Sequence, residues 1–124
     1  MSQYYTPGQV AERFDVSIDT LRYYERIGVL NPIERSTSGH RRYRAADVEL
    51  LDLVRCLRDT GMPIAGMRRF ADLVREGDAS IPDRIALLAE HESELAAHID
   101  VLLARQAHIR EKIAYYRSVL AERS

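Results

Sequence analysis

With 124 residues, the chain has room for one small domain and an extension, and its hydrophobic fraction of 46% is ordinary for a globular protein. No apolar run approaches the roughly 20 residues that span a bilayer, and the start lacks a basic segment followed by an apolar one. We therefore expect a cytoplasmic protein without a membrane partner. The single cysteine, Cys56, excludes an internal disulfide and a cysteine-rich structural zinc site.

The net charge of −1 conceals an uneven distribution along the chain. Residues 1–44 contain seven arginines against five acids, whereas residues 45–124 contain eleven basic residues against fourteen acids. The densest basic stretch, residues 35–44, has four arginines and no acid. Because a phosphate backbone attracts such local positive charge, this stretch is a candidate nucleic-acid contact.

Residues 6–30 predict two short helices separated by a tight turn. Thr6 is a favourable N-cap for the first helix, and Gln9 stands where it can complete a capping box. Ser17 is the N-cap of the second helix, and Gly28 supplies its stop. This arrangement is typical of a helix-turn-helix.

The second helix has one apolar and one polar face. Ile18 and Leu21 are expected to point inward. The opposite face carries residues at helical spacing, namely Asp19, Arg22, Tyr23 and Arg26. An exposed face with two arginines and an aromatic ring suits the major groove of DNA.

A small hairpin, or wing, is predicted after the second helix. Residues 33–35 and 41–43 flank a turn-forming Ser-Thr-Ser-Gly segment, with Gly39 near the tip. The wing arginines would lie beside the second helix. Near the start of the chain, Tyr4 and Tyr5 predict a very short strand.

Two further helices complete the predicted head. One covers residues 45–59 and ends at Gly61, with a weak N-cap at Arg44 that Asp47 partly offsets by its negative charge in the first turn. Its inward residues are Val48, Leu51, Val54 and Leu57. The other begins at Pro63, ends at Gly77, and buries Met67, Phe70, Ala71 and Val74.

The last third of the chain predicts a long helix with a heptad seam. The seam residues are Ile81, Ile85, Leu88, Glu92, Leu95, Ile99, Leu102, Gln106, Ile109, Ile113, Tyr116 and Leu120, ten of which are apolar. At ~1.5 Å per residue, forty residues make a rod of roughly 60 Å. We expect the seam to pair with the same helix of a second subunit. In an antiparallel pair crossing near Ile99, Glu92 and Gln106 would face each other and set the register.

These motifs together identify a family. The runs VSIDTLRYYERIGVL, GHRRY and RCLRDTGMPI, followed by the long helix, resemble the MerR family of bacterial transcription regulators over essentially the whole chain. The resemblance implies a mostly α-helical homodimer, with winged helix-turn-helix DNA-binding heads (residues 1–77) joined by an antiparallel coiled coil of dimerisation helices (residues 78–124). It also implies binding to double-stranded promoter DNA, which the dimer bends and untwists so that RNA polymerase can engage.

The resemblance also implies which residues contact DNA. The contacts carried over from the family are Thr20, Arg22, Tyr23 and Tyr24 on the second helix, and Arg41 and Tyr43 on the wing. Arg42 fills a variable family position and is included on its charge alone. For Tyr24, a DNA contact and a place in the core are both open.

Cys56 is the candidate sensor of a signal. The segment from Arg55 to Met62 resembles the subgroup of the aldehyde and nitrosative-stress regulators AdhR and NmlR, in which this thiol is the proposed sensor, so the implied inducer is a small electrophile. Arg55 and Arg58 would favour a thiolate, whereas Asp52 would oppose it. The alternative is a small hydrophobic residue buried in a helix.

Other functions are less well supported by the sequence. A metal site across a dimer could use His91 and His98, but a solvated helix face explains them more simply, so we expect no metal and no cofactor. A thiol enzyme would need a base near Cys56, where the sequence has no histidine, and we expect no enzyme activity. The main alternative is a coiled-coil interaction module without specific DNA binding, which the arginine-rich wing argues against.

Overall fold

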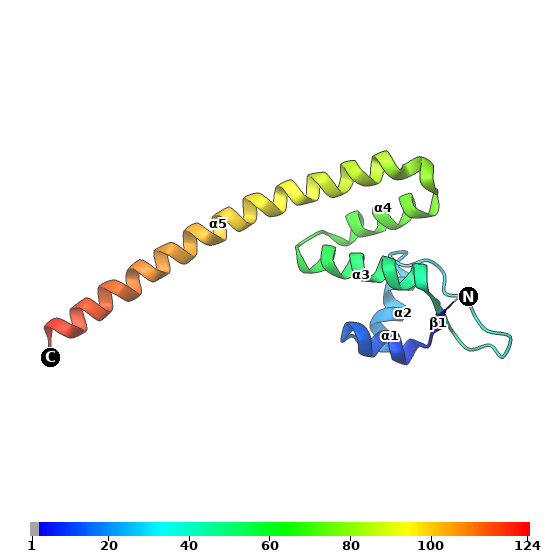
Figure 1. Ribbon diagram of the computed structural model, residues 1–124, viewed down its shortest axis with the longest axis horizontal. Helices are drawn as coiled ribbons and strands as arrows, with labels where there is room; N and C mark the ends of the chain where they lie inside the picture. Colours follow the sequence, from blue (N-terminus) through cyan, green and yellow to red (C-terminus); the bar gives the residue numbers. More distant parts are fainter. Residues whose placement is uncertain (1–2) are drawn as a thin grey trace. The chain divides into compact units, whose positions relative to one another are not determined.

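The computed structural model describes residues 3–124 and is predominantly helical (Figure 1). The elements in chain order are β1 (Tyr4–Tyr5), α1 (Pro7–Phe14), α2 (Ile18–Arg26), β2 (Tyr43–Arg44), α3 (Ala45–Asp59), α4 (Ile64–Arg75), the 3-10 helix η1 (Asp78–Ser80) and α5 (Ile81–Glu122). This order confirms the predicted head and long C-terminal helix. Among residues 3–124, no helix is both long and apolar enough to cross a membrane.

The chain divides into two compact units, Met1–Leu87 and Leu88–Ser124. Helix α5 begins in the first unit and runs through the second. The boundary after residue 77 stays a prediction, which is based on the change from a globular pattern to a heptad seam.

The two predicted N-caps of the helix-turn-helix are present. Thr6 Oγ1 accepts a hydrogen bond from the Gln9 N–H at 3.1 Å, and Gln9 Oε1 accepts one from the Thr6 N–H at 2.9 Å. At the second cap, Ser17 Oγ accepts the Thr20 N–H at 3.0 Å. Asp15 makes the turn in a left-handed conformation with φ of 53°, which aspartate tolerates better than most residues. Local signals therefore determine where both helices begin.

Replacing Ser17 with alanine is expected to lower the free energy of unfolding by about 1 kcal/mol, because the Thr20 N–H loses its hydrogen bond to Ser17 Oγ and keeps only the one to the Ser17 carbonyl at 3.1 Å. Urea unfolding followed by circular dichroism measures this change. Ser93→Ala, at an exposed position within α5, is the matched control and should lose no stability. Equal stability of Ser17→Ala and the parent protein would contradict the capping role.

The core of the head contains side chains from α1, α2, the segment after α2, the end of the wing, α3 and α4. Its apolar members are Val10, Phe14, Leu21, Tyr24, Val29, Leu30, Ile33, Tyr43, Val48, Leu50, Leu51, Val54, Leu57, Met62, Met67, Phe70, Ala71 and Leu73. Most of the predicted inward residues are among them, which confirms the predicted helix faces.

Two core predictions are wrong. Ile18 is 40% exposed, because it is the first residue of α2 and lies at the edge of the core. On α4, Leu73 is 1% exposed, whereas Val74 is only half-buried. The 3-10 helix η1 packs against α4, and Ser80 Oγ donates to the Leu73 carbonyl there.

The wing is shorter than the predicted hairpin. Its strands meet in one bridge, Arg35 opposite Arg41, and Gly39 turns at the tip with φ of 85°. The predicted strand at Tyr4–Tyr5 is confirmed as β1, and it pairs antiparallel with β2, so that Tyr5 lies opposite Tyr43. The end of the wing therefore forms a two-stranded sheet with the start of the chain (Figure 1).

Asp47 caps α3 in place of the Arg44 side chain. Its Oδ2 accepts the Arg44 N–H at 2.8 Å and lies 3.7 Å from the Arg44 Nε, and the residue is 1% exposed. The predicted weakness of Arg44 as a cap is thus offset by a buried carboxylate. This bond also attaches the end of the wing to the first turn of α3.

A hydrogen-bonded junction connects α4 to α5. Ser80 Oγ donates to the carbonyls of Leu73 and Gly77, the latter at 2.8 Å. Arg84, in the first turns of α5, donates to Ser80 Oγ at 2.9 Å and to the Gly77 carbonyl at 2.7 Å. The start of α5 is therefore fastened to the end of α4.

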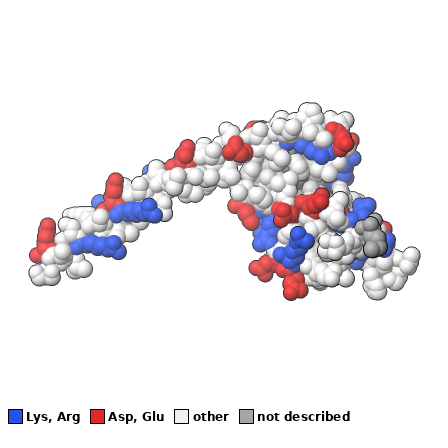
Figure 2. Space-filling view, in the orientation of Figure 1, with Lys and Arg blue, Asp and Glu red and all other residues white. Residues whose placement is uncertain are grey.

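The apolar seam of α5 is open to solvent. Along Ile81–Glu122, which the structure describes in full, no residue is buried. Ile85 is 62%, Leu102 53% and Leu120 71% exposed. In Figure 2, charged side chains occur at intervals along α5 with uncharged surface between them. A contiguous exposed apolar face of this kind marks an interaction surface.

Candidate nucleic-acid interface

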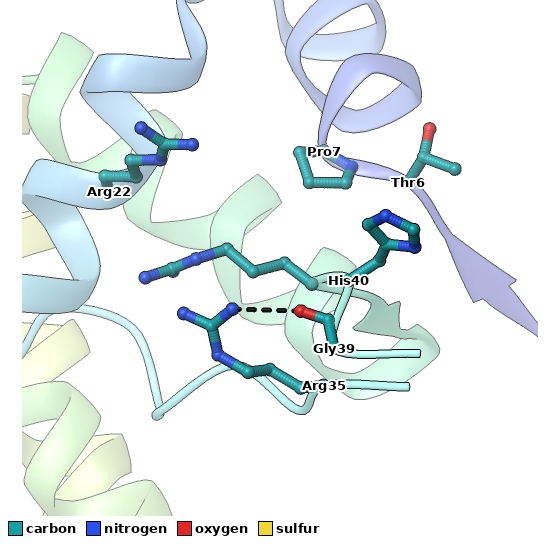
Figure 3. A pocket seen from close by; sticks show the side chains of 7 residues that line it. Thr6, Pro7, Arg22, Arg35, Gly39 and His40 are labelled. Carbon is teal, nitrogen blue, oxygen red and sulfur yellow. Dashed lines mark hydrogen bonds between the residues drawn. The ribbon is translucent and has the colours of Figure 1, made fainter. Parts of the chain in front are cut away.

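A basic cleft of about 730 Å³ opens between the start of α1, the exposed face of α2 and the wing. It is lined by Thr6, Pro7, Arg22, Arg35, Gly39, His40 and Arg41. Figure 3 shows that Arg22 comes from α2 and that Arg35 and His40 come from the wing. Three guanidinium groups around one concave surface create a site that attracts a polyanion.

Three of the predicted contacts lie on the outer part of α2. Arg22 is exposed and lines the cleft. Tyr23 is 39% exposed, and the Arg26 guanidinium lies 5.5 Å from its ring centroid. Thr20 is half-buried, with Oγ1 3.0 Å from Ser17 Oγ. Of these three residues, Arg22 and Tyr23 belong to the face predicted for the major groove, and both are exposed, whereas Thr20 lies at the edge of that face.

The two remaining predicted tyrosines lie in the core. Tyr24 is 5% exposed, and its hydroxyl accepts a hydrogen bond from Arg58 at 2.8 Å. Tyr43 is 1% exposed, and burial, together with the charges of Glu25 and Asp47, raises the pKa of its phenol above 10.0. For Tyr24, the structure therefore favours the core position of the two that the sequence left open.

The wing arginines have different surroundings. Arg41 is half-buried, lines the cleft and forms an ion pair with Glu25 of α2. Arg42 instead donates to Glu34 Oε1 at 2.6 Å, and its guanidinium lies 4.0 Å from the centroid of the Tyr4 ring. Arg35 donates to the Gly39 carbonyl at 3.0 Å, as drawn in Figure 3. The structure thus brings Arg22 and Arg41 to the cleft and directs Arg42 toward Glu34 and Tyr4.

Glu25 belongs to this site, although the sequence analysis did not select it. Its Oε1 accepts the Ile33 N–H at 2.7 Å, and its Oε2 pairs with Arg41. Burial by itself would raise the pKa of this carboxyl group, but the hydrogen bonds from Ile33 and Arg41 and the charges of Arg41 and Arg35 lower it below 4.5 overall. The group is therefore ionised at neutral pH. The sequence does not indicate this role, because the partner Arg41 lies sixteen positions along the chain.

Cys56 is exposed on α3, so it is not a buried hydrophobic residue. The two flanking arginines bind other partners: Arg58 donates to Tyr24 and Asp59, and Arg55 lies 4.0 Å from Asp59. Within residues 3–124, no cluster of three or more His, Cys, Asp or Glu side chains is arranged to hold a metal ion. The thiol is accessible to a small reactant.

Comparison with known families identifies the chain. The model described as "MerR HTH family regulatory protein" matches residues 5–73, and the model described as "MerR, DNA binding" matches residues 48–121. The chain belongs to the MerR family. It is a DNA-binding transcriptional regulator with a helix-turn-helix head.

Individual relatives of this MerR regulator agree. It is 32% identical over 117 residues to an HTH-type transcriptional regulator of Haemophilus influenzae, covering 94% of the chain and 87% of the relative. It is 36% identical over 87 residues to AdhR of Bacillus subtilis, covering 70% of the chain and 62% of AdhR. The structure of HiNmlR, described as lacking the sensor domain and bound to promoter DNA, matches with a TM-score of 0.85 and 31% identity, covering 96% and 94% of the two chains. These similarities confirm the predicted resemblance to AdhR and NmlR.

Proposed function

We propose that this MerR regulator acts as a homodimer that bends and untwists promoter DNA in response to a small electrophile. The observation that carries the DNA contact is the basic cleft lined by Arg22, Arg35 and Arg41. A cleft with three guanidinium groups can clamp phosphates, and a guanidinium can also bind a guanine edge through two hydrogen bonds.

The proposed contacts divide by exposure. Thr20, Arg22, Tyr23 and Arg41 reach bases or phosphates directly, and Arg42 adds positive charge beside them. Tyr24 and Tyr43, the two buried members of the predicted set, support DNA binding by packing α2 and the wing against the core. Arg58, which donates to the Tyr24 hydroxyl, links this packing to α3.

The exposed seam of α5 supports a homodimer. Pairing it with a second copy, in the antiparallel arrangement, would remove apolar residues such as Ile99 and Leu102 from water. Two heads on one rod imply a two-fold site whose spacing the rod determines. Deforming such a site costs several kcal/mol, so a small change in the dimer can decide whether RNA polymerase engages the promoter. The proposed location is the cytoplasm, where the promoter is found.

Binding to the DNA upstream of its own gene tests this function. We expect log K to fall by about 0.9 for each phosphate contact per unit of log salt concentration, and a footprint with two-fold character. Fluorescence anisotropy at several salt concentrations and hydroxyl-radical footprinting measure both. Binding that does not respond to salt, or a footprint without two-fold character, would favour the interaction module instead.

The accessible Cys56 supports an electrophile as the signal. Its thiolate can add to an aldehyde carbonyl, with the carbonyl oxygen taking up a proton, to form a hemithioacetal. Arg58, two residues later on α3, is bound to Tyr24 of α2, so a rearrangement at the thiol has a short path to the DNA-binding helix. The MerR relatives are transcriptional regulators, and we propose no catalytic activity; consumption of more than one equivalent of aldehyde per thiol would indicate an enzyme.

Cys56→Ser is expected to abolish induction by formaldehyde or methylglyoxal while leaving uninduced promoter binding unchanged, because a hydroxyl is a far weaker nucleophile than a thiolate. A promoter reporter measures induction. As a control, adding Ser93→Cys on α5 to this variant should not restore it. Full induction of Cys56→Ser would end the sensor proposal.

A further inference from the structure

Glu25 connects α2 to both arms of the wing. Its Oε1 accepts the backbone N–H of Ile33, where the chain enters the wing, at 2.7 Å. Its Oε2 pairs with Arg41, on the returning arm. The side chains of Glu25 and Arg41 are only 19% and 24% exposed, so this link is partly shielded from water. One carboxylate therefore fixes three segments relative to one another.

The charge of Glu25 is unfavourable for DNA binding when considered alone. It is ionised at neutral pH, and its partner Arg41 lines the cleft together with Arg22 and Arg35. A carboxylate at this position repels phosphates and neutralises part of the positive field. A carboxylate here is explained if the link between α2 and the wing favours DNA binding by more than the repulsion of phosphates disfavours it.

We propose that Glu25 is a positioning residue for DNA binding, which holds the wing against α2 and directs the Arg41 guanidinium into the cleft. A guanidinium has five N–H donors, so an arginine held through one nitrogen can still donate to a phosphate. Holding it in advance also reduces the side-chain entropy lost on binding. This inference rests on the proposed DNA contact by Arg41 and adds a residue that does not itself touch DNA.

Glu34 provides a matched control within the same wing. Its carboxylate also pairs with arginines, with Arg42 at 2.6 Å and with Arg44 at 4.0 Å, and it is 35% exposed. Neither arginine belongs to α2, so these pairs make no link to that helix. Glu25→Gln and Glu34→Gln each remove one negative charge from the head, and only the first weakens the link between α2 and the wing.

A pure charge effect and a positioning role of Glu25 predict opposite changes in the affinity of Glu25→Gln for promoter DNA. If charge alone mattered, both variants would bind promoter DNA at least as tightly as the parent. If Glu25 positions Arg41, Glu25→Gln should bind about tenfold more weakly, whereas Glu34→Gln should bind equally or more tightly. Anisotropy titrations at one fixed salt concentration measure both. A Glu25→Gln affinity equal to or above that of the parent would overturn the inference.

A double-mutant cycle with Arg41→Ala separates positioning from a general loss of structure. In the Arg41→Ala background, Glu25→Gln should have little further effect, because the guanidinium that it orients is absent. An undiminished loss in that background would overturn the inference.

If circular dichroism shows that Glu25→Gln does not fold, Glu25→Asp replaces it. The aspartate keeps the negative charge, but its side chain is one methylene shorter, so the carboxylate lies farther from Arg41. A folded Glu25→Asp should bind more weakly, and parent-like binding would overturn the inference. Failure of the parent protein to bind DNA would instead overturn the proposed function.

Discussion

Leu102→Asp is expected to convert the proposed homodimer into monomers and to weaken promoter binding by about 100-fold or more, because linked heads bind a two-fold site with a high effective concentration that separate heads lack. Leu102 lies on the α5 seam and is 53% exposed in the single chain. Pairing would place an aspartate at this position in an apolar interface, where an unpaired charge is strongly unfavourable. Analytical ultracentrifugation measures the oligomeric state, and anisotropy measures DNA binding.

Val101→Asp is the matched control for this experiment. Val101 is 51% exposed, almost the same as Leu102, but it lies about 100° away around the helix and off the seam. The same substitution there should leave the dimer and its DNA affinity unchanged. A dimer that survives Leu102→Asp, or that dissociates equally with Val101→Asp, would rule out the seam as the dimer interface.

Arg22→Ala is expected to weaken promoter binding by about 30-fold or more, because each of the two heads of the proposed dimer loses an arginine contact worth about 1–3 kcal/mol. Arg22 is exposed on α2 and lines the basic cleft. If it contacts a guanine edge, the variant should also discriminate less between base pairs at that position. Titrations against the promoter and against a set of single base-pair substitutions measure both effects.

Arg13→Ala controls for the loss of one positive charge from the head. Arg13 is exposed on α1, and its guanidinium lies 5.6 Å from the centroid of the Phe14 ring, outside the set of cleft residues. Its removal should change affinity by no more than about twofold, because Arg13 does not line the cleft and salt screens the interaction of an exposed charge with DNA. Similar losses of promoter affinity for Arg13→Ala and Arg22→Ala would show that Arg22 acts only through the net charge of the head.

Local sequence signals predicted most of the fold. The caps at Thr6 and Ser17 depend on bonds to residues three positions away, so a short window of sequence contains all the information needed. The position of α3 and the long uninterrupted α5 likewise follow from helical periodicity and glycine stops. Arg22 was found in the same way, because its exposure follows from the face of α2 on which it lies.

Long-range partners were not predictable from these patterns. Glu25 is hydrogen-bonded to Arg41, sixteen positions along the chain, and Tyr24 is hydrogen-bonded to Arg58, thirty-four positions along it. The pairing of β1 with β2 likewise joins the start of the chain to the end of the wing. Helical periodicity places each residue on a face but carries no information about what packs against that face. The burial of Tyr24 and the participation of Glu25 therefore required the structure.

The junction of Gly77, Ser80 and Arg84 indicates where the dimerisation helix of this protein can be replaced by another. These residues fasten the first turns of α5 to the end of α4 through hydrogen bonds formed entirely within the first compact unit. A chimera that retains residues up to Leu87 and receives a foreign zipper from residue 88 onward keeps that attachment intact. The foreign zipper would then determine which chain the protein pairs with, while the native DNA-binding head stays unaltered.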